Sequence, residues 1–175
     1  VFPQWQVAEA IPERAKLVAY GMDWGFTNDP TALVSVWLED YSLYIKEHLY
    51  KTGMTNHDIS KELTALNLDR TPIICDSAEP KSIEELHRFG HNVKPSKKGP
   101  DSIRLGIDIM KRHKIYILAD SLNAQKEFRN YQWEVDRNGT QLSKPKDQNN
   151  HIVDAVRYVC INRIGAPYSG KYYIS

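Results

Sequence analysis

Apolar residues fall into three closely spaced runs in the first third of the chain. Each run is about as long as a strand and is bounded by turn-forming or polar residues. The links between the runs are short, which favours antiparallel neighbours. The pattern therefore predicts a meander of three strands, at 17–23, 31–38 and 43–50.

After the meander, the spacing of apolar positions alternates between that of a helix and that of a strand. Thr55 is placed to cap the first helix, because Ile59, Leu63 and Leu66 follow it at helical spacing. This order predicts an α/β fold with a mixed β-sheet, in which parallel strands join the antiparallel meander and helices flank both faces. The later elements expected are a strand at 72–76, a helix at 81–89, an extended piece at 92–95, a helix at 101–112, a strand at 115–118, and helices at 121–130 and 150–164.

An extra β-hairpin is expected at 131–144. Asn138-Gly139 lies there between arms in which polar and apolar residues alternate, the strongest short-range signal for a hairpin. The two ends of the chain show little periodicity. We therefore expect a lead-in or linker at 1–16, one folded domain at 17–164 and a flexible tail at 165–175.

The composition is that of an ordinary globular protein. With 175 residues, 41% of them apolar and 26% charged, the chain is large enough for one domain with a proper core. No apolar run approaches roughly 18 residues, and the first residues do not resemble a signal peptide, so we expect neither a membrane span nor secretion. Cys75 and Cys160 lie in apolar surroundings and are expected to be reduced core residues.

Positive charge is clustered along the chain, although the net charge is only +1. This balance excludes the globally basic surface of a strong nucleic-acid binder. Clusters of this kind usually lie on solvated faces. Around an acidic centre they would instead hold a phosphate backbone. The clusters are formed by Lys94, Lys97 and Lys98, by residues 111–114, and by Lys144 and Lys146.

Two aspartates stand at the ends of predicted strands. Asp23 closes the first strand, and Asp76 closes the strand at 72–76 in the same way. If these two strands are parallel neighbours, both carboxylates emerge at the same edge of the sheet. An aspartate at a strand end also has a structural explanation, because its side chain can begin a turn by accepting a backbone N–H two residues further on.

A third aspartate lies on the last predicted helix. His151 and Asp154 are three residues apart and therefore share one face of its first turn. The helix dipole favours an acid at this place whatever its function. Asp154 is, however, flanked by Val153, Ala155 and Val156, which is unusual for a surface charge.

Three carboxylates brought together need a cation in order to stay ionised together. Oxygen ligands without a thiolate select Mg²⁺ or Mn²⁺. Two such ions about 4 Å apart can activate a water and stabilise the leaving oxygen of a phosphodiester. Asp23, Asp76 and Asp154 are therefore the ligands of a candidate two-metal site.

Three short segments carry these aspartates. They read GMDWGFTNDP at 21–30, CDSAEPKS at 75–82 and NHIVDAVRY at 150–158. Together they closely resemble the nuclease domain of the large terminase subunit of tailed bacteriophages, with the motifs in the same order over about residues 17–164. Three motifs in register are much more specific than any one of them. The resemblance implies an RNase H-like fold, shared with RuvC resolvase and retroviral integrase.

The family implies a metal-dependent DNA endonuclease, which cuts concatemeric viral DNA when genome packaging begins and ends. It carries the role of metal ligand to Asp23, Asp76 and Asp154, with Asp23 bridging two Mg²⁺ or Mn²⁺ ions. Double-stranded DNA is the substrate that the resemblance implies.

Other residues receive roles from the same resemblance. Asp29 would be an accessory acid near the metals, although Asn-Asp-Pro equally predicts a turn. His151 would act on the attacking water or orient a ligand; a histidine here also has a simpler explanation as a helix cap or surface residue. Lys97, Lys98 and Lys81 would contact DNA, and the hairpin would lie across the groove and restrict access to it.

The chain departs from full-length large terminase subunits in one respect. It has no Gly-x-x-x-x-Gly-Lys-Ser/Thr phosphate-binding loop and does not begin with Met, which predicts an isolated C-terminal nuclease domain. In the longer protein, the implied partners are its own ATPase domain, the small terminase subunit and the portal. The implied location is the cytoplasm of the infected bacterial host, with transient docking at the procapsid portal.

Three other interpretations stay open on the sequence alone. Resolvases and transposases share the expected fold, although the segment around Asp76 argues against them. The segment after Asp23 also resembles the first phosphate loop of actin-like ATPases and sugar kinases, which need a second such domain and loop. In the third interpretation the acids are structural, and the chain is a DNA- or portal-binding module without catalysis.

Overall fold

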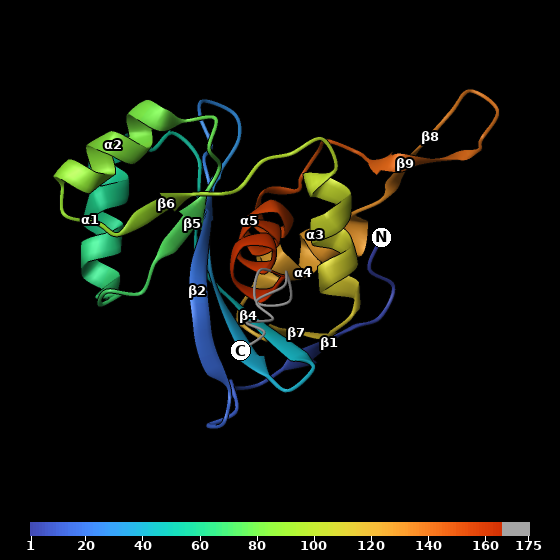
Figure 1. Ribbon diagram of the computed structural model, residues 1–175, viewed down its shortest axis with the longest axis horizontal. Helices are drawn as coiled ribbons and strands as arrows, with labels where there is room; N and C mark the ends of the chain where they lie inside the picture. Colours follow the sequence, from blue (N-terminus) through green and yellow to red (C-terminus); the bar gives the residue numbers. More distant parts are fainter. Residues whose placement is uncertain (166–175) are drawn as a thin grey trace, which may run out of the picture.

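A seven-stranded mixed sheet separates two groups of helices in the computed structural model, which describes residues 1–165 (Figure 1). The strands are β1 (Trp5–Ala8), β2 (Lys16–Asp23), β3 (Thr31–Glu39), β4 (Ser42–Lys51), β5 (Ile73–Cys75), β6 (Val93–Pro95) and β7 (Lys114–Leu118). Their order across the sheet is β1-β7-β4-β3-β2-β5-β6.

The centre of the sheet is the expected meander, in which β3 runs antiparallel to both β2 and β4. Parallel strands extend it on both sides. On one side β5 pairs with β2 and β6 with β5, and on the other side β7 pairs with β4. The predicted mixed sheet is therefore confirmed, and the first apolar run of the chain is one of its central strands.

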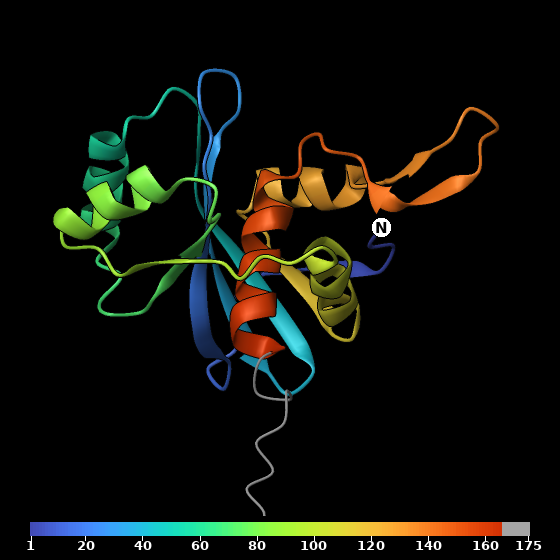
Figure 2. The ribbon, with the colours of Figure 1, turned by 45° about the horizontal axis from the view of Figure 1, so that its top comes forward.

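Helices cover both faces of the sheet, as predicted, and the turned view in Figure 2 shows the same two layers. Helices α1 (Asn56–Leu66) and α2 (Pro80–Arg88) lie on one face. On the other face lie α3 (Ser102–Lys111), α4 (Leu122–Asn130) and α5 (His151–Val159), and α5 continues as a π-helical turn, η1 (Cys160–Ile164). Thr55 caps α1 as expected, and Asp58 completes a capping box.

Two hydrophobic cores fill the space between the sheet and its helices. Alternation along β2 sends Ala19 into the core beneath α3, α4 and α5, whereas Tyr20 and Met22 enter the core beneath α1 and α2. Both cysteines, Cys75 and Cys160, are buried and free, as expected. Because helices cover both faces of the sheet, a site on it is expected where the strands end.

The N-terminal segment contributes to the folded body, contrary to the expectation of a lead-in over 1–16. Residues 5–8 form β1, the outermost strand of the sheet, which pairs in parallel with β7. Phe2 is buried against the rings of Phe128 and Tyr131. The sequence signal was weak because β1 is only four residues long and half exposed. The tail expected after Gly165 lies outside the described residues.

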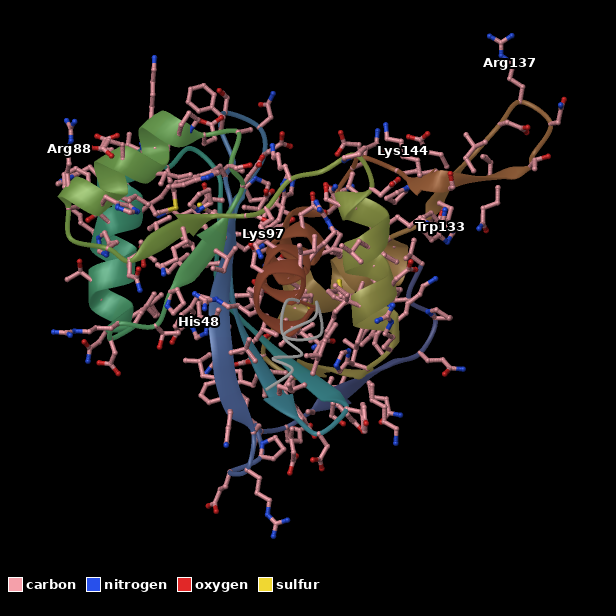
Figure 3. The ribbon with its side chains drawn as sticks, in the orientation of Figure 1. His48, Arg88, Lys97, Trp133, Arg137 and Lys144 are labelled. Carbon is pink, nitrogen blue, oxygen red and sulfur yellow. The ribbon has the colours of Figure 1, made fainter. Side chains whose placement is uncertain are left out.

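The predicted hairpin is present and projects from the body (Figure 3). It consists of β8 (Trp133–Val135) and β9 (Gln141–Pro145). The Asp136 carboxylate organises the turn by accepting the backbone N–H groups of Asn138 and Thr140, both at 2.8 Å. Of the two central residues, only Gly139 has a positive φ. Within residues 1–165, every helix is too short or too polar to cross a membrane.

Candidate metal centre at the sheet edge

Asp23 and Asp76 end neighbouring strands at the same edge of the sheet. Strands β2 and β5 are parallel, and Met22 is paired with Cys75. Asp23 is the last residue of β2 and Asp76 immediately follows β5, so the chain leaves the sheet at neighbouring positions with an aspartate at each. The condition under which the sequence placed both acids at one edge, that their strands are parallel neighbours, is thereby met.

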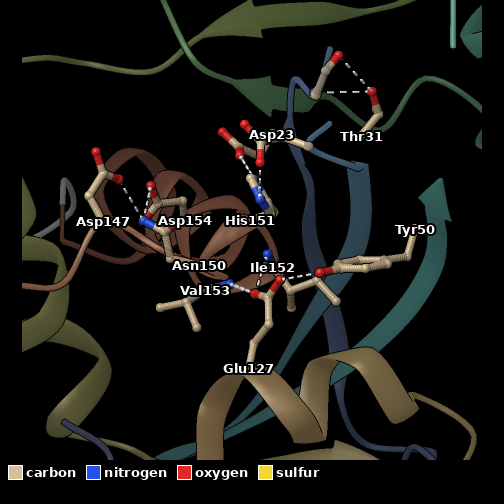
Figure 4. Close-up of polar contacts among 12 residues, drawn as sticks. Asp23, Thr31, Tyr50, Glu127, Asp147, Asn150, His151, Ile152, Val153 and Asp154 are labelled. Carbon is tan, nitrogen blue, oxygen red and sulfur yellow. Dashed lines mark hydrogen bonds and ion pairs between the residues drawn. The ribbon is translucent and has the colours of Figure 1, made fainter. Parts of the chain in front are cut away.

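Helix α5 brings Asp154 to this edge from the face of the sheet. The helix packs on β2 and β3, with Ile152, Val153 and Val156 fully buried beneath it. Gly21 on β2 has no side chain to hold the helix away. The first turn of α5 therefore presents His151 and Asp154 towards the end of β2 (Figure 4).

Asp23 is a carboxylate of intermediate burial, with 14% of its side chain exposed and two side-chain partners. Its Oδ2 lies 3.0 Å from Nδ1 of His151 (Figure 4). Its Oδ1 accepts a hydrogen bond from the hydroxyl of Tyr158 at 3.2 Å. Burial raises the pKa of Asp23, while the contacts with His151 and Tyr158 lower it in part and the charge of Asp76 raises it again. The contacts with His151 and Tyr158 therefore offset only part of the effect of burial on the pKa of Asp23.

Asp154 is held by the next turn of its own helix. Its Oδ1 accepts a hydrogen bond from Nε of Arg157 at 3.2 Å and forms an ion pair with Nη2 of the same residue at 3.1 Å. Its Oδ2 accepts a hydrogen bond from the side-chain amide of Asn150 at 3.4 Å. The pKa of Asp154 is raised to about 6: burial and the charge of Asp23 raise it, while the charge of Arg157 and its hydrogen bond lower it. The charge of Asp23 therefore acts on Asp154 across the site.

Asp76 is more exposed and is paired with a lysine. Its Oδ1 lies 2.8 Å from Nζ of Lys98 and accepts the backbone N–H of Ala78, the local turn that an aspartate at a strand end was expected to form. After β6 the chain passes in front of α5 towards α3 (Figure 2), where the backbone N–H of Lys97 donates to Asn162. Lys97 and Lys98 are exposed there. Lys81 is exposed on the first turn of α2.

His151 lies between two aspartates. One ring nitrogen, Nδ1, contacts Asp23, and the other, Nε2, is 3.6 Å from Oδ1 of Asp29. The side chain of Asp29 is 72% exposed. The hydrogen bond with Asp23 raises the pKa of His151, and the charges of Asp23, Glu127 and Asp29 add to this effect against burial. The structure therefore brings together Asp23, His151 and Asp29 by direct contact, with Asp154 and Asp76 nearby.

The donor chemistry of this cluster fits a hard divalent cation. Asp23, Asp76 and Asp154 offer only oxygen, and burial of most of the side chain raises the pKa of Asp23 and Asp154. Within residues 1–165, however, the side chains of three or more His, Cys, Asp or Glu residues do not converge in the geometry of a metal site. Instead, the ammonium group of Lys98 lies beside Asp76, and the ring of His151 lies beside Asp23, at the positions that a cation would take.

Three residues of this site were missed by the sequence analysis. Arg157 and Tyr158 lie one turn beyond Asp154, so helical spacing could have indicated that they reach the acids. Glu127, on α4, accepts the backbone N–H groups of Ile152 and Val153. Its partners are main-chain atoms of a distant helix, so the sequence carried no signal for that contact.

Comparison with known proteins gives the same family on three grounds. Residues 23–160 match the family model described as the terminase RNase H-like domain. The chain is 32% identical to the large terminase subunit of Bacillus phage SPP1 and 29% identical to the PBSX phage terminase large subunit of Bacillus subtilis strain 168. Each alignment covers 90% of this chain but only 40% and 37% of the relative, so the chain spans about two fifths of the length of these relatives.

The fold is similar to those of solved terminase nucleases. The nuclease domain of the large terminase from bacteriophage SPP1, solved with bound Mn, has a TM-score of 0.78 and 26% identity, over 90% of this chain and 96% of that one. The large terminase nuclease from thermophilic phage G20c, solved with bound magnesium, has a TM-score of 0.63 and 19% identity, over 88% and 85%, a likeness of fold alone. The expected RNase H-like fold is confirmed, and because the family model matches most of its length, the chain belongs to the terminase RNase H-like domain family.

Proposed function

We propose that this domain is a metal-dependent DNA endonuclease, which cuts concatemeric viral DNA during genome packaging as part of a large terminase subunit. The observation that supports the proposal is the placement of Asp23, Asp76 and Asp154 near one end of the sheet, from two parallel strands and a helix. Buried acids with raised pKa values are typical of a site completed by a cation or a substrate.

In this proposal Asp23, Asp76 and Asp154 would hold two Mg²⁺ or Mn²⁺ ions. When bound, the ions supply electrostatic stabilisation of the attacking and leaving oxygens of a phosphodiester. His151 orients the Asp23 carboxylate through Nδ1, and Asp29 is near enough to its other ring nitrogen to fix the ring. Arg157 keeps Asp154 oriented on α5.

The substrate in this proposal is double-stranded DNA. Lys97 and Lys98 are exposed beside Asp76, where they would meet phosphates on either side of the scissile bond, and Lys81 would add a contact from α2. The hairpin, with Arg137 at its tip and Lys144 nearer the body (Figure 3), would lie across the groove and limit access. With a net charge of +1, we expect weak binding without sequence preference.

The relatives extend the proposal to the longer protein. The SPP1 and G20c nucleases were solved with Mn and magnesium, which supports these metals for the same family. The large terminase of another thermophilic bacteriophage, of which this chain covers 42%, was solved in complex with ADP. We infer an ATPase domain, the small terminase subunit and the portal as partners, and the cytoplasm of the infected host, with transient docking at the procapsid portal, as the location.

Plasmid cleavage tests the proposal directly. The native domain and its Asp23→Asn variant are incubated with supercoiled plasmid in Mn²⁺, in Mg²⁺ or in EDTA, and nicked and linear products are measured on gels. We expect cleavage by the native domain with either metal, none in EDTA, and a loss of roughly 100-fold or more in the variant. The control is Asp108→Asn, which makes the same change on an exposed part of α3.

Two outcomes would count against the proposal. Cleavage that persists in EDTA, or that survives Asp23→Asn, would place the activity outside this site. Absence of Mn²⁺ from crystals of the native domain soaked with the ion, with no cleavage in solution, would reject the metal-dependent nuclease and leave a binding module.

A further inference from the structure

Glu127 is a buried carboxylate that joins three elements of the fold. It lies on α4 and is only 2% exposed. Its Oε1 accepts the hydroxyl of Tyr50 on β4 at 2.9 Å, and its Oε2 accepts the backbone N–H groups of Ile152 and Val153, at 2.7 and 3.2 Å (Figure 4). All three partners are donors, so the contacts suit the ionised carboxylate.

Helix α5 depends on this carboxylate for its N-terminal cap. The first N–H groups of a helix have no partner within the helix and need an acceptor from elsewhere. Asn150 occupies the capping position, but its side chain makes no capping bond. Glu127 supplies the missing acceptor from another helix, and its negative charge lies at the positive end of the α5 dipole.

The capped turn is the one that carries the candidate site. His151 is the residue immediately before the two bound N–H groups, and Asp154 is the residue immediately after them. From this turn His151 contacts Asp23, and Asp154 lies close enough to Asp23 to sense its charge. A shift of the first turn of α5 would therefore move two of the proposed site residues at once relative to the end of β2.

A second carboxylate, from the sheet, holds the first turn of α4, the helix that carries Glu127. Glu47 on β4 caps the first turn of α4: it accepts the backbone N–H of Ala124 at 3.0 Å and the side-chain amide of Asn123 at 2.6 Å. The backbone N–H of Glu47 donates to Ser121. Two carboxylates thus link β4 to α4 and α4 to α5, so that the central sheet sets the position of the α5 N-terminus.

We propose that Glu127 is a positioning residue, whose carboxylate caps α5 and holds His151 and Asp154 in register with Asp23. Its contact with the metal centre is indirect, through the helix. The inference rests on the proposed function for the role of the site, whereas the cap itself is independent of that function. Loss of such an outer partner typically costs roughly 10- to 100-fold in metal affinity.

The test compares Glu127→Ala and Glu127→Gln with Thr55→Ala, which removes the cap of α1, a helix without proposed site residues. Hydrogen–deuterium exchange at the amides of Ile152 and Val153 reports the cap without metal or substrate. Calorimetric titration with Mn²⁺ reports the affinity of the site. Plasmid cleavage, resolved into kcat and KM, reports its alignment.

In Glu127→Ala we expect faster exchange at the two amides, Mn²⁺ binding weaker by roughly tenfold or more, and a fall in kcat with little change in KM. Glu127→Gln keeps an acceptor but loses the charge, so its values should lie between those of the native domain and Glu127→Ala. Thr55→Ala should change none of the three, even where it lowers the melting temperature.

The inference would be overturned if Glu127→Gln, or Glu127→Ala that still folds, kept both the native exchange rates at the two amides and the native affinity for Mn²⁺. A loss of Mn²⁺ affinity in Thr55→Ala equal to that in Glu127→Gln would also overturn it, because the effect would then follow general destabilisation. If the native domain binds no Mn²⁺, the proposed function fails, while the exchange at Ile152 and Val153 still decides whether Glu127 caps the helix.

Discussion

Gly21 on β2 lies directly beneath the main-chain carbonyl of Ala155 on α5: a Cβ built on Gly21 would fall 2.1 Å from that oxygen. Real side chains do not approach a carbonyl so closely, so only glycine allows this contact. Asp23 lies two residues beyond Gly21, and Asp154 immediately precedes Ala155. The contact therefore sets how near the helix brings its carboxylate to the end of the strand.

Gly21→Ala should destabilise the domain and impair the site together. The added methyl group has to push α5 away from β2, and overpacking of this kind costs about 1–3 kcal/mol. We expect a lower urea midpoint in the unfolding curve and a fall in cleavage larger than the loss of folded protein explains. Gly99→Ala is the control, because the space around Gly99 is open. Native stability in Gly21→Ala would mean that the helix is not held by this contact.

Asp76→Asn should abolish cleavage and leave the fold intact. Asparagine keeps the side-chain oxygen that accepts the Ala78 N–H, so the turn after β5 survives. It loses the charge that a divalent cation and Lys98 both require. Plasmid cleavage and circular dichroism of the same preparation measure the two effects. Retained cutting would remove Asp76 from the site.

Replacing Lys97 and Lys98 with alanine should weaken DNA binding and flatten its dependence on salt. Each lysine that neutralises a phosphate adds about one unit to the slope of log K against log salt. We expect the slope, measured by fluorescence anisotropy, to fall by about one to two. The control replaces Lys16 and Lys114 with alanine, which removes the same amount of charge. These lysines begin strands β2 and β7, at the opposite end of the strands from the acids. An unchanged slope in the test variant would show that Lys97 and Lys98 do not meet phosphate.

The metal-free domain should lose stability as the pH rises. Burial raises the pKa of Asp154 from 3.8 to about 6, so the folded state binds this proton more tightly than the unfolded chain. The contribution to the free energy of unfolding therefore falls between about pH 4 and 6. The pKa of His151 is raised by Asp23, so the stability it adds is present below its ordinary pKa and is lost as the pH rises through its raised value.

Urea unfolding in EDTA at about pH 5 and about pH 8 checks this prediction. Asp154→Asn should remove part of the pH dependence, because asparagine does not titrate in this range. Added Mn²⁺ should stabilise the native domain more at the higher pH than at the lower, since protons compete with the metal for the aspartates. Equal pH dependence in the native domain and in Asp154→Asn would contradict the raised pKa as a source of the effect.

Local patterns along the chain were enough to predict most of the fold. The meander, the capped helix after Thr55 and the hairpin around Gly139 follow from signals carried by near neighbours in the sequence. Asp23 and Asp76 were each predicted to close a strand because each follows an apolar run, and the parallel pairing of β2 with β5 then brings them to one edge of the sheet. Strand β1 was missed, since a four-residue edge strand owes its existence to β7 rather than to its own sequence.

The sequence by itself determined which residues carry the candidate chemistry, because the motifs around Asp23, Asp76 and Asp154 are local and specific. The tertiary structure alone decided how those residues are held. His151 and Asp23 are 128 positions apart, and Glu127 reaches main-chain atoms of α5 that no residue type reveals. Periodicity reports on neighbours along the chain, whereas a cap supplied by another helix and the close approach at Gly21 exist only once the layers have packed.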